Sequence, residues 1–206
     1  MSTAPVPMKR HALRLPAGSV RAIHVLAIVG LVCAIILIPG NHTIPPYLIY
    51  LLFMMIGHYF AAHGVTIATR DDLSPSPLYL PGGTIRALIL VALVGCIGWK
   101  LYKDHDGLVE QFTLSLEKLK SEPILPLVIL GGFFVGVIVR TLISGLGSSP
   151  ALQDFEAWIS LIALIGIVLA GIIHLIVNPS LEEAVSLPTW EGFVGGVVAF
   201  YFGERS

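Results

Sequence analysis

Apolar residues gather in long runs along this chain, and each run ends at a cluster of glycine, proline or charged residues. A helix needs about 20 residues to cross the roughly 30 Å of hydrocarbon in a bilayer. Five runs reach that length, and they predict spans at residues 22–39, 47–68, 84–102, 123–145 and 156–177. The pattern therefore predicts an all-α fold, a polytopic transmembrane helix bundle.

A sixth apolar segment, from Trp190 to Phe202, is short and rich in glycine. It crosses the bilayer only if its flanks, residues 187–189 and Gly203, belong to the helix. We expect a sixth span here, and the alternative is a half-helix that re-enters the membrane. Six spans place both termini on the same side, whereas five spans place Arg205 on the opposite side.

The basic residues favour six spans, because Lys and Arg resist translocation and collect in cytoplasmic segments. With six spans, all seven arginines lie on the N-terminal side, which holds Lys9, Arg10, Arg14, Arg21, Arg70, Arg86, Arg140 and Arg205. The other side holds four lysines interleaved with five acidic residues. We therefore expect cytoplasmic N- and C-termini, and the short loops fit a bacterial inner membrane.

The composition indicates a single membrane domain over residues 1–206, because 55% of the residues are hydrophobic and 12% are charged. No sizeable soluble catalytic domain fits in the remainder. Residues 1–21 form a basic cytoplasmic segment, and the apolar run that follows is too long for a cleaved signal peptide. The net charge of −1 argues against nucleic acid as a partner. Membrane lipid is the expected environment.

An eight-residue motif occurs twice, 65 residues apart, as Leu-Pro-Ala-Gly-Ser-Val-Arg-Ala at 15–22 and Leu-Pro-Gly-Gly-Thr-Ile-Arg-Ala at 80–87. We expect Ser19 and Thr84 to cap the first turn of a helix. Each motif is followed by two spans, so residues 22–68 and 84–145 are predicted to form parallel helix-hairpin repeats, with a C-terminal helix pair at 156–203. The alternative is that the motif is a convenient helix start that arose twice.

The loop at residues 103–122 has a helical pattern of its own. Leu108, Phe112, Leu116 and Leu119 recur at spacings of four, four and three. This spacing predicts an amphipathic helix that lies on the membrane surface. The alternative is a docking face for the extramembrane domain of a partner.

Few groups within the spans are suited to chemistry. The acidic residues lie at predicted helix ends or in the loop, which disfavours ion-coupled transport. Arg21, Arg86 and Arg140 either line an inner vestibule or contact lipid headgroups. His24 and His63 both lie toward the inner side and are the candidate ligands for haem b. Cys33 and Cys96 lie within apolar runs, and no metal site is expected.

Small residues form stripes on the fourth and sixth predicted helices, where they allow helix backbones to approach closely. The stripe on the sixth helix is the expected contact with another protomer or a partner subunit. The residues of the two stripes are Gly132, Gly136, Gly192, Gly195, Gly196, Ala199 and Gly203.

No motif for nucleophilic, phosphate or metal catalysis is present. We therefore expect a non-enzymatic membrane protein that acts by assembly, as a homo-oligomer or as a structural or accessory subunit of a larger membrane complex. One alternative is a channel or uncoupled transporter with an arginine-lined inner vestibule. Another is a membrane anchor associated with haem or quinone.

Overall fold

The computed structural model describes residues 13, 15–16, 18–38, 42–61, 77–80, 83–144, 150–177 and 188–204. These ranges contain seven α-helices and no strands, which confirms the predicted all-α class. The helices are α1 (Ser19–Leu37), α2 (Pro46–Ala61), α3 (Thr84–Lys103), α4 (His105–Ser121), α5 (Ile124–Ser144), α6 (Pro150–Ile172) and α7 (Pro188–Glu204). A short 3-10 turn, η2 (Pro77–Tyr79), precedes α3, and a wider π turn, η3 (Ile173–Val177), follows α6.

Four helical segments are long and apolar enough to cross a membrane. They are Ser19–Leu37, Thr84–Lys103, Ile124–Leu142 and Asp154–Val177. Two further apolar helices, α2 and α7, are shorter, with 16 and 17 residues. α1, α3 and α5 each begin and end within three residues of a predicted span. α2 begins one residue before its predicted span and ends at Ala61, with residues 62–68 of that span outside the described residues, and α6 begins six residues before its predicted span. The sixth apolar segment forms one continuous helix, α7.

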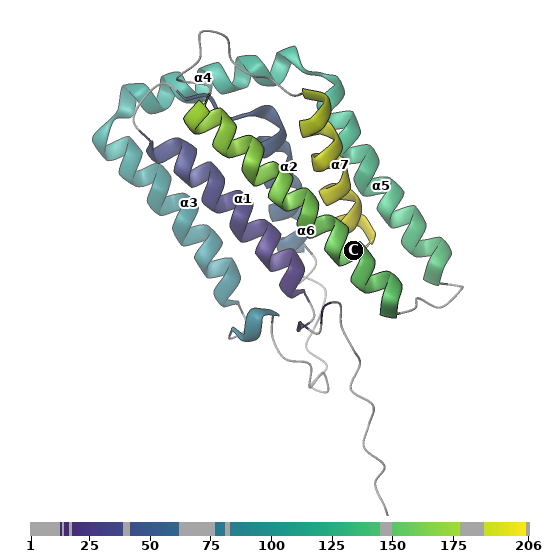
Figure 1. The fold of residues 1–206 in the computed structure, drawn as a ribbon. Helices are drawn as coiled ribbons and strands as arrows, with labels where there is room; N and C mark the ends of the chain where they lie inside the picture. Colours follow the sequence, from purple (N-terminus) through teal and green to yellow (C-terminus); the bar gives the residue numbers. More distant parts are fainter. Residues whose placement is uncertain are drawn as a thin grey trace, which may run out of the picture.

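Six helices lie side by side, and α4 lies across one end of them (Figure 1). α3, α1 and α6 form a row in which α1 is central, α2 and α7 pack against this row, and α5 lies on the far side of α7. Consecutive bundle helices run in opposite directions. As a result, α1 begins and α7 ends at the same end of the bundle, which we call the inner end. The end covered by α4 is the outer end.

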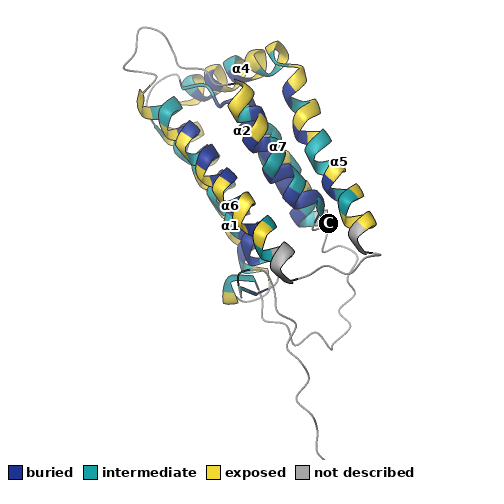
Figure 2. Cartoon of the chain, turned by 45° about the vertical axis from the view of Figure 1, so that its right-hand side comes forward, coloured by how far each residue is buried: buried dark blue, intermediate teal, exposed yellow. Residues whose placement is uncertain are grey.

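Burial divides the bundle into an interior and an apolar exterior (Figure 2). α1 and α2 contribute many of the fully buried side chains, whereas α3, α5 and α6 expose large apolar ones. Val91, Phe134 and Ile162 are each at least 60% exposed. A soluble protein rarely leaves so many large apolar side chains in water. The exterior therefore suits a lipid environment.

Both repeated motifs begin a helix with a glycine in the left-handed region, Gly18 at φ 81° and Gly83 at φ 88°. The prediction that Ser19 and Thr84 cap these helices is wrong. Each is the first helical residue, and neither helix has a side-chain cap. The preceding position needs a positive φ, which glycine adopts without a Cβ clash. Ser19 Oγ instead accepts a hydrogen bond from Leu78 N at 2.9 Å.

Two leucines before these helices also have positive φ, Leu13 at 56° and Leu78 at 53°, and they too lie 65 residues apart. Such a conformation costs a non-glycine residue about 1–3 kcal/mol. Leu13 N donates to Asp154 Oδ1 on α6 at 2.6 Å, just as Leu78 N donates to Ser19 on α1. The first hydrogen bond ties the segment before α1 to α6, and the second ties the turn before α3 to α1. Together they link the three helices of the row near their starts.

α5 and α7 make the closest helix contact in the described bundle. A Cβ atom on Gly132 would overlap the carbonyl oxygen of Gly196, and one on Gly136 would overlap that of Phe200. From the other side, a Cβ atom on Gly203 would overlap the carbonyl oxygen of Phe133. The two backbones therefore touch directly, and only glycine fits at these positions.

We predict that Gly136→Ala and Gly203→Ala each lower the free energy of unfolding by about 1–3 kcal/mol or more, because the added methyl group forces the backbones apart. Gly131→Ala is the matched control, since nothing lies within 4 Å of its Cβ position on the same helix. Thermal unfolding in mild detergent measures the effect. Equal melting temperatures for Gly131→Ala and Gly136→Ala would show that the contact is looser than described.

Candidate functional site

Polar side chains of α1 and α2 meet at the inner end of the bundle. Arg21 Nη1 lies 3.2 Å from His58 Nε2. A guanidinium group has donors and no acceptor, so it donates to this nitrogen. Both Arg21 and Arg86 interact electrostatically with the hydroxyl of Tyr59, which neighbours His58 on α2. The motif arginines of α1 and α3 therefore converge on the inner part of α2.

Arg86 has an incomplete set of partners in this cluster. Its guanidinium carbon lies 5.9 Å from the centre of the Phe60 ring, within range for a cation–π interaction. Its Nη2 atom is buried and has no hydrogen-bond partner among the described residues. A buried donor without a partner is rare in folded proteins.

The three predicted vestibule arginines do not come together. Arg140 is exposed on α5, and α5 and α3 lie at opposite edges of the bundle (Figure 1). Only Arg21 and Arg86 share a site. A single vestibule lined by all three side chains does not fit this arrangement.

His24 is fully buried between α1, α6 and α7. Its Nδ1 lies 2.8 Å from Val20 O and its Nε2 lies 2.9 Å from Ser160 O. The ring stacks on Tyr201 at a centroid distance of 5.8 Å. Haem ligation by His24 would require one of these nitrogens to leave its carbonyl oxygen. The other candidate ligand, His63, lies outside the described residues.

A search of the described residues for three or more His, Cys, Asp or Glu side chains placed to hold a metal ion finds no such group. Cys96 Sγ lies 3.4 Å from Cys33 O, and Cys33 Sγ lies 3.6 Å from Ala92 O. Both thiols are free. They donate to backbone oxygens where α1 packs on α3.

The predicted small-residue stripes lie at helix contacts within one chain. The side chains of Leu125, Val128 and Ile129 on α5 face the α7 stripe. α5 therefore occupies the space that a second subunit would need. A contact between subunits through these residues does not fit, and they serve helix packing instead. They are Gly132, Gly136, Gly192, Gly195, Gly196, Ala199 and Gly203.

At the outer end, α4 packs on the bundle through a partly polar face. Gln111 Nε2 donates to Ile35 O at 3.2 Å and to His42 O at 2.6 Å. Ser115 Oγ accepts from Ile44 N at 3.0 Å. These partners are backbone groups at the end of α1 and in the link to α2, where no helical partner exists. α4 thus closes the outer end of the α1–α2 hairpin.

The residues of the predicted apolar face of α4 differ in their burial. Leu108 is buried against the bundle, whereas Phe112 and Leu116 are exposed. The leucine spacing therefore predicted the helix itself correctly, and its position on a membrane surface stays a prediction. Part of its apolar face points away from the other described helices.

Asp104 fixes the corner between α3 and α4. Its Oδ2 lies 2.9 Å from Lys100 Nζ, and its Oδ1 accepts from Gly107 N at 3.0 Å. The hydrogen bonds from Lys100 and then from Gly107 hold the pKa of Asp104 below its ordinary value. Because the folded-state pKa is lowered, this stabilisation is present at neutral pH and is lost as the pH falls through that pKa.

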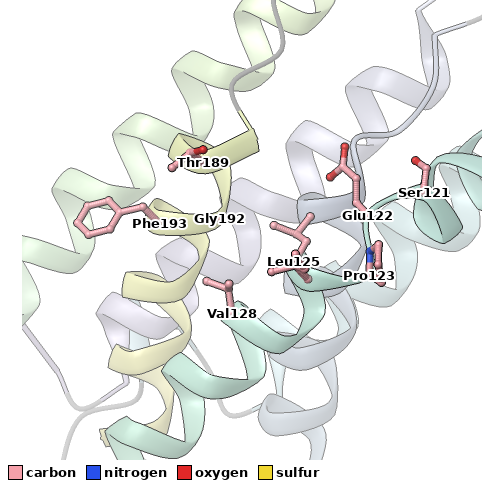
Figure 3. Close-up of a pocket in the computed structure, with 9 residues that line it drawn as sticks. Ser121, Glu122, Pro123, Leu125, Val128, Thr189, Gly192 and Phe193 are labelled. Carbon is pink, nitrogen blue, oxygen red and sulfur yellow. The ribbon is translucent and has the colours of Figure 1, made fainter.

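A cavity of about 640 Å³ lies between the outer ends of α5 and α7 (Figure 3). Leu125 and Val128 of α5 and Phe193 of α7 make it mainly apolar. Glu122 and Thr189 add polar groups. Its lining suits an apolar chain with a polar end.

No protein-family model, curated protein or solved structure matches this chain. The function must therefore be inferred from the chemistry of its own residues.

We predict that Gln111→Leu lowers the free energy of unfolding by about 1–3 kcal/mol, because it leaves two backbone carbonyl oxygens unpaired. Thr113→Val on the exposed side of α4 is the control, and its effect should stay within about 0.5 kcal/mol. Thermal unfolding in detergent measures both. A neutral Gln111→Leu variant would mean that α4 does not close the outer end in this way.

Proposed function

We propose that this chain is a six-span membrane protein that acts by assembly, as a homo-oligomer or as a structural or accessory subunit of a larger membrane complex, and not as an enzyme. The distribution of charge supports the topology. Arg21, Arg86 and Arg140 lie toward the inner end, and the outer end carries lysines mixed with acids. The inner end is therefore cytoplasmic in this proposal, and a bacterial inner membrane fits the short loops.

The shorter helices α2 and α7 count as spans in this proposal. At about 1.5 Å per residue, each is about 25 Å long, slightly less than the hydrocarbon thickness. Both run beside the long helices over much of the bundle (Figure 1). Their flanking residues and local thinning of the bilayer complete the crossing.

The matching backbone conformations of the two motifs support the proposed duplication. Left-handed leucines and glycines recur at the same 65-residue spacing as the sequence motif. Asp154 on α6 accepts a hydrogen bond from Leu13 N as Ser19 on α1 accepts one from Leu78 N, so Asp154 can be aligned with Ser19. With Ser19, Thr84 and Asp154 aligned, the residues of α1, α3 and α6 can therefore be compared position by position.

The burial of matching residues on these three helices supports assembly. On α1 the compared residues are buried, and they are Ala22, Val25, Val29 and Val32. On α6 the matching residues are also buried, and they are Ala157, Ser160, Leu164 and Ile167. On α3 the matching residues are exposed, and they are Ala87, Leu90, Val94 and Ile97. We call these four residues the α3 open face.

The α3 open face results from the path of the chain. α1 and α6 pack against the bundle helices that follow them, α2 and α7. α4 instead carries the chain from α3 to α5 at the opposite edge (Figure 1). Near the open face, Gly95 and Gly98 have nothing within 4 Å of their Cβ positions. A helix of another subunit can therefore approach closely there.

The arrangement gives less support to the two alternative functions. The channel alternative depended on three arginines around one vestibule, and Arg140 lies apart from Arg21 and Arg86. The haem alternative depended on His24 and His63. Both ring nitrogens of His24 lie at hydrogen-bonding distance from backbone oxygens, and His63 lies outside the described residues.

We predict that Val94→Trp weakens assembly about tenfold or more, because overpacking at a helix contact costs about 1–3 kcal/mol. The matched control is Val135→Trp, since Val135 is equally a valine on an exposed face, that of α5. Native mass spectrometry of gently released protein, over a range of concentrations, measures the assembled fraction and any foreign subunits. A wild-type chain that stays a monomer throughout would overturn the proposal.

A further inference from the structure

The buried Nη2 of Arg86 has no acceptor among the described residues at the inner ends of α1, α2 and α3. One face of the guanidinium rests over Phe60, so its edges are what remain for hydrogen bonding. An unsatisfied buried group costs free energy, and a charged one costs more than a neutral one. Nη2 can therefore take an acceptor from a bound molecule without giving up a hydrogen bond to a described residue.

The surroundings of Arg86 are basic. Arg21 supplies a second guanidinium group from the matching motif position, and the Tyr59 hydroxyl interacts electrostatically with both. α1, α2 and α3 contain no Asp or Glu. The described acids at this end are Asp154 and Glu156 of α6, which lies on the other side of α1 from α3 (Figure 1), and Glu204 at the end of α7, the helix that packs on the far side of α2. The chemistry of the cluster therefore favours an anion.

We propose that Arg86 and Arg21, with the hydroxyl of Tyr59, bind a phosphate group. The planar fork of a guanidinium matches two phosphate oxygens, and a hydrogen bond between opposite charges is stronger than a neutral one. The cluster lies where the proposed topology puts the cytoplasmic headgroups, so the phosphate comes from an anionic phospholipid or from solution. Arg86 directly precedes Ala87 of the α3 open face, but the phosphate contacts themselves do not depend on assembly.

The test compares the full chain with single variants in mild detergent, by native mass spectrometry during titration with phosphatidylglycerol. Arg86→Gln should weaken binding about tenfold, as expected for the loss of a charge-assisted hydrogen bond. Arg86→Lys keeps the charge but loses the planar fork of the guanidinium. Its affinity for phosphatidylglycerol should therefore lie between those of the wild type and Arg86→Gln. Arg140→Gln is the matched control, because this exposed arginine lies at the same end on α5, and it should leave the affinity unchanged.

Inorganic phosphate distinguishes the two sources. If inorganic phosphate binds in the absence of lipid, and if its competition with phosphatidylglycerol requires Arg86, the site takes free phosphate. If it does not compete and phosphatidylcholine binds weakly, the site takes an anionic headgroup. Equal losses in Arg86→Gln and Arg140→Gln would overturn the proposal, and so would phosphatidylglycerol binding that is indifferent to both. The melting temperatures of the lipid-free variants verify that each is folded.

Discussion

Backbone polar groups that cannot reach water must find partners inside the protein, and this constraint explains many of the described hydrogen bonds between distant segments. His24 reaches a carbonyl oxygen on α6, and His174 Nε2 lies 2.8 Å from Thr43 O. Gln111 and Ser115 pair the backbone at the α1–α2 link. Side chains of this chain thus join helices mainly by pairing backbone groups at helix ends, while apolar packing fills the space between them.

The α4 helix determines which helices become neighbours. A tight turn after α3 would have placed α5 beside it, as α2 lies beside α1 and α7 beside α6. Instead, α4 leads to the opposite edge and the contact between α5 and α7 replaces the expected hairpin. The open edge at α3 and the glycine contact at α7 are therefore two results of one connection.

The apolar runs predicted the helices well, because a span depends on local composition and length. They did not predict which helices pair, since Gly132 and Gly136 show that a close contact is possible but not with which helix. The positive φ of Leu13 was missed, although leucine recurs at 13 and 78 and extends the motif. The pairing of Arg21 with Arg86 followed from the repeat, whereas the separation of Arg140 depends on the tertiary path of α5.

The pairing of α5 with α7 also affects the order in which the bundle can form during synthesis. α6 lies between them in the chain, so the glycine face of α5 has no partner until α7 has been made and inserted. α1 and α3 can associate much earlier, because their contact needs only the first half of the described chain. The glycine face of α5 therefore stays uncovered until α7 has been inserted. The final position of α5 is decided after α7 has been translated, and not when α5 itself leaves the ribosome.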